Sequence, residues 1–377
     1  MVAFSLGKLF GRSQEGSILG IDIGASSAKV VQLRASKGAA ILETYGEIAL
    51  GPYGNAAIGK AVKLPPEKIA EALTDLMREA NVTARTGGLS IPFSASLVSI
   101  IDLPKVDDDA LARMVPIEAR KYIPIPISEV TLDWFVIPRE EEGASAFDRV
   151  EEPSPLRAKG QEVLLVAIHN ATVKNYQAIA SAIGVKVHFF EIEIFSEARS
   201  SMEHGTAPVL VVDIGAAMTK MYIVERGIVR LTHLVTTGGQ HMTDTLARSL
   251  SWDFEKAERV KRERGLIDSS AYGTEENAKI KSALLSTLAR VFAEVDRVLL
   301  SYGQRYNKNV SHVLFAGGGA SLPGLKEHAK TALRAEVTVA DPFARAEAPA
   351  FLKDVLQQIG PGFAVSIGLA LRELKHL

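Results

Sequence analysis

One stretch of the sequence occurs twice, and this repeat restricts the fold more than any other feature. Residues 18–33 read ILGIDIGASSAKVVQL and residues 209–224 read VLVVDIGAAMTKMYIV, and the two match at six of sixteen positions without a gap. In each copy an apolar strand leads into an Asp-x-Gly turn of small residues, and a second apolar strand follows. The repeat therefore predicts two related halves whose turns face each other across a cleft.

Composition excludes several classes of function. The length of 377 residues suits a chain of two lobes, and 47% hydrophobic with 23% charged residues is an ordinary globular balance. The formal net charge of −1 provides no basic field for nucleic acid, so we expect no nucleic-acid partner. The sequence has no cysteine, which excludes disulfides and thiolate chemistry and fits a reducing cytoplasm.

The sequence shows no segment long and apolar enough to cross a bilayer. Its first twelve residues, MVAFSLGKLFGR, lack the continuous apolar core of a signal peptide. We expect residues 1–16 to be a leader before the first strand. A short amphipathic helix that touches a membrane is the alternative.

The secondary structure is expected to follow the repeat. In the first half, strands at 29–33 and 41–50 precede a helix that Pro65-Pro66 opens and that ends near residue 80. In the second half, strands at 221–224 and 228–234 precede a helix at 239–250. The same reasoning predicts a strand at 312–316 and helices at 254–265, 277–305 and 363–374.

The segment between the two halves has its own pattern. Strands are expected at 89–92, 96–103, 131–137 and 162–168, with a helix from Asp107-Asp108-Asp109 to about residue 122. This predicts a β-β-α-β-β insert at 86–170, with a first-lobe core at 17–85 and 171–207 and a second lobe at 208–377. The charged, Gly- and Pro-containing stretch 139–161 is expected to be an exposed, mobile hairpin tip. The three aspartates suit a helix cap better than a metal site.

The repeated turns have the chemistry of a phosphate and metal site. Glycine lets the backbone approach a phosphate, and Asp22 or Asp213 supplies a hard oxygen for Mg²⁺ through retained water. Ser26, Ser27 and Thr219 would add hydroxyl donors. A single Asp-x-Gly turn would be weak support, because tight turns favour these residues in general. Its recurrence with the same flanking strands favours nucleotide binding.

Two further glycine clusters follow strands. Gly238-Gly239 precedes a helix with a polar start, which suits phosphate binding at a helix N-terminus, although a simple loop is the alternative. Gly317-Gly318-Gly319 has apolar flanks, which favours packing against a base or sugar over a flexible linker. The sequence has no Gly-x-x-x-x-Gly-Lys-Ser/Thr loop, no His-Glu-x-x-His and no Gly-x-Ser-x-Gly.

Together these features resemble the actin-like ATPases, the class of actin, Hsp70 and the sugar kinases. Within it the sequence is most similar to the PilM family of type IV pilus assembly proteins, which are related to the division protein FtsA. The similar segments are GIDIG at 20–24, EARKYIP at 118–124, LVA at 165–167, VVDIG at 211–215 and IGLALR at 367–372. The resemblance implies an α/β, ribonuclease H-like fold of two lobes with an FtsA-like inserted subdomain.

The resemblance also implies a role for each matching residue. The two turns would hold the phosphates of ATP, with Asp22 and Asp213 binding Mg²⁺ through water. Glu258 and Lys261 would contact ribose or adenine, and Glu193 would orient the attacking water, or else be a solvated acid at a helix start. The implied cofactor-binding set is Asp22, Gly24, Ala25, Ser26, Ser27, Lys29, Asp213, Gly215, Thr219, Lys220, Gly238, Gly239, Glu258, Lys261, Gly317, Gly318, Gly319 and Ser321.

The implied function is that of a cytoplasmic ATP-binding scaffold at the inner membrane. It would bind the N-terminal cytoplasmic tail of a PilN-like membrane protein beside the insert, with lobe closure set by the nucleotide. The resemblance leaves open self-association and whether ATP is hydrolysed at a functional rate. Two alternatives share the fold. One is a small-molecule kinase, for which no second-half Asp-x-x-Arg element stands out, and the other is an FtsA-like protein, whose C-terminal amphipathic helix is not seen after Arg372.

Overall fold

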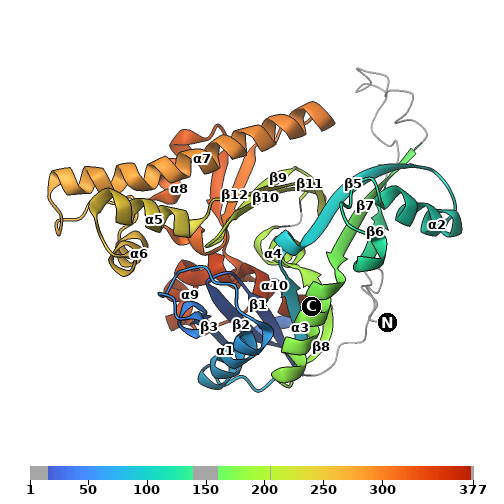
Figure 1. The fold of residues 1–377 in the computed structure, drawn as a ribbon, viewed down its shortest axis with the longest axis horizontal. Helices are drawn as coiled ribbons and strands as arrows, with labels where there is room; N and C mark the ends of the chain where they lie inside the picture. The colour runs from blue at the N-terminus through green and yellow to red at the C-terminus, as the bar shows by residue number, and fades with distance from the viewer. Residues whose placement is uncertain (1–15, 139–159, 204, 375–377) are drawn as a thin grey trace. The chain divides into compact units, whose positions relative to one another are not determined.

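The computed structural model describes residues 16–138, 160–203 and 205–374 (Figure 1). Within them the chain divides into two compact units, one made of residues 94–174 and the other of residues 16–93 and 175–374. The expected leader at 1–16 and the expected hairpin tip at 139–161 lie almost wholly outside the described residues.

The larger unit contains a first sheet of five strands in the order β3-β2-β1-β4-β8. β1 pairs antiparallel with β2 and β2 with β3, whereas β4 and β8 continue the sheet in parallel. Every residue of β1 after the first is buried, as expected for the central strand of a sheet that is covered on both faces. The bounds are β1 (Ser17–Ile23), β2 (Ser27–Ser36), β3 (Ala39–Ala49), β4 (Thr86–Ile91) and β8 (Lys186–Ile192).

A second sheet in the same unit repeats this plan, with the order β11-β10-β9-β12-β13. β9, β10 and β11 are antiparallel neighbours, and β12 and β13 continue in parallel. The duplication suggested by sixteen residues therefore extends through two whole sheets of the same strand order and direction. The bounds are β9 (Val209–Ile214), β10 (Thr219–Glu225), β11 (Ile228–Val235), β12 (His312–Ala316) and β13 (Glu336–Val339).

Helices cover both sheets (Figure 1). The C-terminal helix α10 (Ala364–Glu373) packs on β1 and against α4 (Glu193–Ser201), so both belong to the first sheet. α7 (Thr274–Tyr306) carries a stripe of buried residues at helical spacing, from Leu284 to Val298, into the core of the second lobe. The other helices are α1 (Pro66–Glu79), α3 (Asn170–Ala182), α5 (Gly239–Leu250), α6 (Phe254–Glu263), α8 (Leu325–Ala332) and α9 (Lys353–Ile359).

The smaller unit contains β5 (Ser96–Pro104), α2 (Asp108–Ala119), β6 (Val130–Val136) and β7 (Gly160–His169), with a sheet in the order β5-β7-β6. The strand expected to open the insert is instead β4 of the first sheet. It pairs there in parallel with β1 and β8, and all of its residues after Thr86 are buried. The insert is thus β-α-β-β. As expected, Asp107 caps α2, and its side chain accepts a hydrogen bond from Ala110 N at 2.7 Å.

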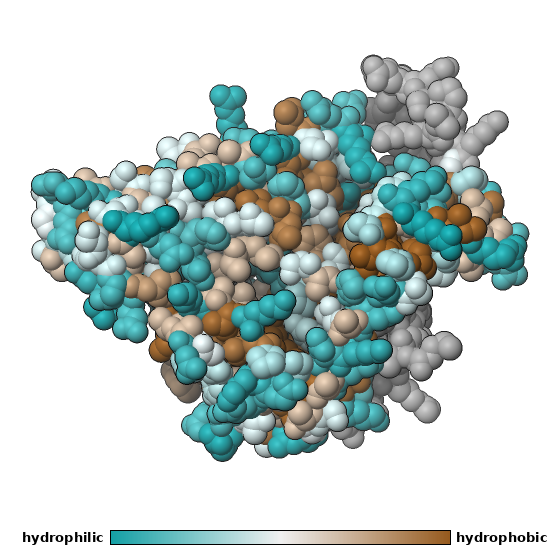
Figure 2. All heavy atoms as spheres, in the orientation of Figure 1, coloured by the Kyte–Doolittle hydropathy of each residue, from teal (hydrophilic) through white to brown (hydrophobic). Residues whose placement is uncertain are grey.

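The strands and helices expected from the repeat are confirmed, with ends that differ by a few residues. The apolar side chains on the visible surface form small groups among hydrophilic ones (Figure 2). In the described ranges, no helix has the length and apolar composition that crossing a membrane requires.

Candidate functional site

The two copies of the turn have the same backbone geometry. Gly24 N donates a hydrogen bond to Ser27 O at 2.9 Å, and Gly215 N donates to Met218 O at 3.0 Å. The strand register is also the same, since Asp22 lies opposite Lys29 on β2 just as Asp213 lies opposite Lys220 on β10. Both turns therefore place one carboxylate and one ammonium group at the same end of a central strand.

In the first turn, Asp22 is a buried carboxylate, 7% exposed. Ser90 Oγ, from β4, donates to Asp22 Oδ1 at 2.8 Å, and Asp22 forms no ion pair with the described residues of the chain. Burial raises the pKa of Asp22, although Lys29 and Lys220 oppose this. An acid held in this way would gain from a nearby cation, which fits the hard oxygen ligand expected for Mg²⁺.

Lys29 of the first turn has a side chain that is 12% exposed, and its polar partners belong to the first half. Its Nζ donates to Ser27 Oγ at 2.9 Å and lies 3.2 Å from Glu47 Oε1, whose side chain is 44% exposed. Its stem passes close to Gly362, where an added Cβ would lie 3.4 Å from Lys29 Cε and 3.7 Å from Gly318 Cα. The first turn, Lys29 and the glycine loop near Gly318 are thereby brought together.

Lys220 of the second turn is buried and pairs with two carboxylates. Its Nζ forms one ion pair with Asp213 and a second with Glu193 Oε2 at 2.6 Å. Burial acts to lower the pKa of Lys220, but Asp213, Glu193 and Glu197 together raise it well above its usual value, so the lysine is charged.

Glu193, the expected catalytic residue, is the first residue of α4. Both of its oxygens accept a hydrogen bond, Oε1 from Phe93 N at 2.7 Å and Oε2 from Lys220 Nζ at 2.6 Å. Burial raises its pKa, with Lys220 acting in the opposite direction. Because both of its oxygens accept hydrogen bonds inside the protein, Glu193 is not a solvated acid at a helix start.

A second layer lies behind this pair. Glu197 and Tyr222 are both buried, and Tyr222 OH donates to Glu197 Oε2 at 2.9 Å. Burial and the nearby Asp213 raise the pKa of Glu197 well above its usual value. Tyr176 is buried close to Glu193 and Asp22, which with burial itself raise the pKa of its hydroxyl. These three residues were absent from the expected site.

The sequence contains a local signal for Glu197 and another for Tyr222. Glu197 follows Glu193 by four residues, so both carboxylates lie on one face of α4, and Tyr222 follows Lys220 by two residues on one face of β10. No local pattern indicates Ser90 or Tyr176, since their closeness to Asp22 depends on the sheet and on α3.

Gly238-Gly239 does lie beside the second turn, but its amides are used there. Gly239 N donates to Gly215 O at 2.8 Å, and Gln240 N donates to Ala216 O at 2.9 Å. Thr219 is fully buried, and its hydroxyl donates to Thr237 O at 2.7 Å. Both features fix the start of α5 against the turn, because these two amides and this hydroxyl already donate to backbone oxygens.

Glu258 and Lys261 form a compact network on α6. Glu258 Oε2 accepts from Thr243 Oγ1 at 2.5 Å and from Lys261 Nζ at 2.6 Å, and Lys261 Nζ also donates to Gly239 O at 3.1 Å. Burial acts to raise the pKa of Glu258, but Lys261 and the hydrogen bonds lower it. The pair is thus joined through Gly239 to the second turn.

A segment of the first half crosses to this network, and we call residues 55–62 the strap. Ala61 N donates to Gln240 Oε1 at 2.8 Å, and Lys60 Nζ lies 5.9 Å from the centre of the Phe254 ring. At Gly59, with φ of +88°, an added Cβ would lie 2.6 Å from Glu258 Oε1. Only glycine combines this backbone with this approach, so the strap is fitted closely to α5 and α6.

The triple glycine lies against the second turn. Gly317 has φ of +75°, and a Cβ there would lie 2.0 Å from Asp213 Oδ1, so glycine is required on both grounds. Gly319 is packed against the side chain of Ile214 in the same way. Ser321 does not join them, because it is exposed and its hydroxyl donates to Gln358 O at 2.9 Å.

Metal ligation by side chains alone is not indicated. In residues 16–138, 160–203 and 205–374, no three His, Cys, Asp or Glu side chains are arranged to hold one metal ion. A metal at Asp22 would therefore take its other ligands from water and phosphate, which is the usual manner of Mg²⁺.

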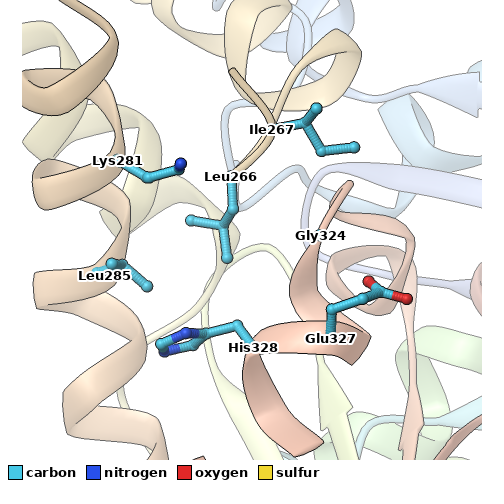
Figure 3. Close-up of a pocket in the computed structure, with 7 residues that line it drawn as sticks. All are labelled: Leu266, Ile267, Lys281, Leu285, Gly324, Glu327 and His328. Atoms are coloured by element: carbon cyan, nitrogen blue, oxygen red, sulfur yellow. The ribbon is translucent and has the colours of Figure 1, made fainter. Parts of the chain in front are cut away.

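A pocket of about 480 Å³ lies elsewhere in the second lobe (Figure 3). Leu266 and Ile267 after α6, Lys281 and Leu285 of α7, and Gly324, Glu327 and His328 at the start of α8 line it. The imidazole of His328 stacks on Phe292, with 5.7 Å between ring centres. None of the residues expected for nucleotide binding lines this pocket.

Comparison with solved structures defines the class. The fold is similar to a PilM-PilN type IV pilus biogenesis complex with a TM-score of 0.77 and 24% identity, covering 96% of this chain and 99% of that one. It is also similar to MreB5 of Spiroplasma citri bound to AMPPNP, with a TM-score of 0.52 and 11% identity over 95% of this chain and 96% of that one. The expected actin-like, two-lobed α/β fold is confirmed.

Sequence comparison then gives the family. The family described as type IV pilus assembly protein PilM matches residues 20–374, so the chain belongs to the PilM family. The cell division protein FtsA of Agrobacterium fabrum is 24% identical over 237 residues, which are 56% of this chain. The chain covers about half the length of the first curated relatives it matches, 51% in this case.

Proposed function

We propose that this protein is an ATP-binding scaffold of a type IV pilus inner-membrane platform. It binds ATP with Mg²⁺ between its two lobes, sets lobe closure by the nucleotide, and binds the N-terminal cytoplasmic tail of a PilN-like membrane protein. It acts in the cytoplasm and is held at the inner membrane through that partner. The observation that carries the proposal is the pair of turns with identical register and hydrogen bonding, whose charged residues share one centre.

The nucleotide part of the proposal rests on the arrangement of charge and glycine. Asp22 is the carboxylate suited to Mg²⁺, and Lys29 is the cation suited to a phosphate. Gly317 and Gly318 bring a glycine loop to Asp213 and Lys29, where a flat group can approach the backbone. The bound Mg²⁺ would neutralise phosphate charge beside the buried acids.

Lobe closure rests on the strap. It belongs to the first half, yet it contacts Gln240, Phe254 and Glu258 of the second half, next to the residues proposed for ribose or adenine. A nucleotide that engages Glu258 and Lys261 would bias this contact, and a ligand shifts an equilibrium only by such differential contacts.

The peptide part rests on the insert and on the family. A solved relative is a complex of PilM with PilN. The insert exposes three large apolar side chains, Ile117 at 64%, Tyr122 at 42% and Phe135 at 39%. Exposed apolar side chains grouped on one small unit suit a short hydrophobic tail, which would bury them.

Calorimetric titration of ATP with Mg²⁺ tests the nucleotide site. We expect one ATP per chain, and we expect Asp22→Ala to weaken binding by roughly 10- to 100-fold, since a charged contact contributes about 1.5–3 kcal/mol. The exposed Asp354→Ala is the matched control. Unchanged affinity in Asp22→Ala would mean that the repeated turn is only structural.

A pull-down with N-terminal peptides of candidate membrane partners, with and without ATP, tests the peptide site. We expect Ile117→Glu to abolish capture without loss of stability, since Ile117 is 64% exposed. Leu300→Glu makes the same change at 63% exposure on α7 and should leave capture intact. Absence of capture by the unmodified protein in both nucleotide states would reject the scaffold function.

A further inference from the structure

Lys220 is not an unpaired lysine that is available to a phosphate. It is 8% exposed, and its ammonium has two carboxylate partners within the protein, Asp213 and Glu193. Ion pairs at this burial are hard to break one partner at a time, because the remaining charge is left without compensation. Lys220 is therefore a permanent cation of the site that is paired within the protein.

The two partners of Lys220 belong to different halves. Asp213 lies on β9, and Lys220 itself lies on β10, both in the second sheet. Glu193 begins α4, which directly follows β8 of the first sheet and packs against α10, and α10 in turn packs on β1. The contact at 2.6 Å between Lys220 Nζ and Glu193 Oε2 is thus a direct ionic link between the lobes.

The first half holds Glu193 firmly in place. Its other oxygen accepts from Phe93 N at 2.7 Å, just after β4. Because this carboxylate is anchored in the first half and paired with a buried ammonium of the second, the ion pair resists separation of the two lobes. A freely rotating side chain would not resist it.

We propose that Lys220 is an interlobe latch: its buried ammonium joins Asp213 and Glu193 and keeps the two lobes closed when no nucleotide is bound. A nucleotide bound to Asp22 and Lys29 of the first half and to Glu258 and Lys261 of the second would add contacts of its own between the lobes, so nucleotide binding closes them even without the latch. The response to nucleotide rests on the proposed function, but closure of the ligand-free protein by the latch does not.

Lys29 provides an internal control for this proposal. It occupies the equivalent place in the first turn, yet its partners are Ser27 and Glu47, both in the first half. A latch role is therefore assigned to Lys220 alone, and substitution of Lys29 should not affect closure of the ligand-free protein.

The test is a distance measurement between two spin labels. The chain has no cysteine, so Glu71→Cys on α1 and Arg259→Cys on α6, both exposed, label one site in each lobe. In the ligand-free protein we expect a single short-distance population. Lys220→Met should shift it to longer distances, Lys29→Met should leave it unchanged, and Mg²⁺ with ATP should restore the short distance in Lys220→Met.

A second variant breaks the latch from the opposite lobe. Glu193→Gln should open the lobes as Lys220→Met does, and the double variant should open them no further, so a poorly folding Lys220→Met does not remove the test. Unchanged distances in ligand-free Lys220→Met or in Glu193→Gln would overturn the latch. Opening in both variants with no response to ATP would support the latch and reject the nucleotide-dependent closure.

Discussion

The two Asp-x-Gly turns have the same backbone and the same register, but their lysines have opposite surroundings. Lys29 meets a hydroxyl and a half-exposed glutamate of its own half, and Asp22 beside it forms no ion pair within the described chain. Lys220 is enclosed by Asp213, Glu193 and the nearby Glu197. A duplicated element has thus kept its geometry and divided its roles, because what surrounds each lysine comes from elsewhere in the chain.

The two lysines therefore differ in where their partners lie: Lys29 is paired within the first half, whereas Lys220 is paired within its own half and across to the first. The first turn presents an acid suited to a metal and a lysine suited to a phosphate. The second turn is internally neutralised, and its contribution is to connect the lobes and to seat Gly317 and the start of α5. The symmetric clamp expected from the repeat therefore becomes an asymmetric one.

The largest expected effect is on the stability of the ligand-free protein. Lys220→Met removes one partner from a buried group of charges, which costs about 3–5 kcal/mol, or roughly 10 °C in the midpoint of thermal unfolding. Lys29→Met should lower the midpoint by less, because its partner Glu47 is 44% exposed and water screens the pair. Calorimetric unfolding of both variants measures the contrast.

A double-mutant cycle with Glu193→Gln then identifies the partner. Coupling between Lys220→Met and Glu193→Gln should make the combined loss smaller than the sum of the single losses. Additive losses would show that Lys220 stabilises the fold through Asp213 alone, and equal losses for Lys29→Met and Lys220→Met would remove the asymmetry.

The sequence predicted the fold well because the fold depends on patterns that are local and repeated. Alternation and turn residues were enough to place β1, β2, β9 and β10. β4 was assigned to the wrong sheet, since Thr86–Ile91 is short and its pairing with β1 and β8 depends on segments far along the chain. Strand pairing between distant segments leaves no local signal.

The sequence predicted the charged residues of the two turns, but not the ion pairs and hydrogen bonds that they form. Asp22, Asp213, Lys29 and Lys220 could be named from the repeat, but equal motifs carried no information on unequal partners. Glu193 and Glu47 come from outside the repeat, and only the fold places them beside Lys220 and Lys29. The same holds for the strap, where Gly59 meets Glu258 across some two hundred residues of sequence.

The next effect concerns the glycine loop, where Gly317 lies against Asp213 of the second turn. Gly317→Ala combines a left-handed backbone at φ of +75° with a collision against Asp213 Oδ1. We expect a loss of about 3 kcal/mol in the free energy of unfolding. Gly227→Ala has the same φ of +75° with no atom near the added Cβ, so it should lose only about 1 kcal/mol. Equal losses would show that the contact with Asp213 is unimportant.

A smaller effect distinguishes the acid behind the second turn. Burial raises the pKa of Glu197, so the folded protein prefers it protonated, and its contribution to stability is lost as pH rises through that raised pKa. Glu197→Gln should therefore be more stable than the unmodified protein at pH 8, and the gain should be smaller at pH 5. Chemical denaturation at both values measures this.

Glu191 is the matched control for the pH experiment. Burial opposes its ionisation, but Arg199 and Arg372 lower its pKa, so its stabilising contribution is present at neutral pH and lost as pH falls. Glu191→Gln should destabilise the protein at pH 8. A gain in both variants would mean that the ion pairs of this region contribute nothing.

The smallest expected effect is on ATP turnover, where the latch and the expected catalytic role of Glu193 meet. Both oxygens of Glu193 accept hydrogen bonds, so the residue has little capacity to orient a water while Lys220 holds it. At saturating ATP, Lys220→Met should therefore raise the hydrolysis rate by about fivefold, equivalent to about 1 kcal/mol. Release of phosphate measures the rate, and Glu193→Gln in the same chain should cancel the gain. If Lys220→Met raises the rate equally with and without Glu193, the increase comes from looser lobes and not from a released Glu193. If Lys220→Met lowers the rate, Lys220 is a phosphate ligand like Lys29, and the two turns have the same role.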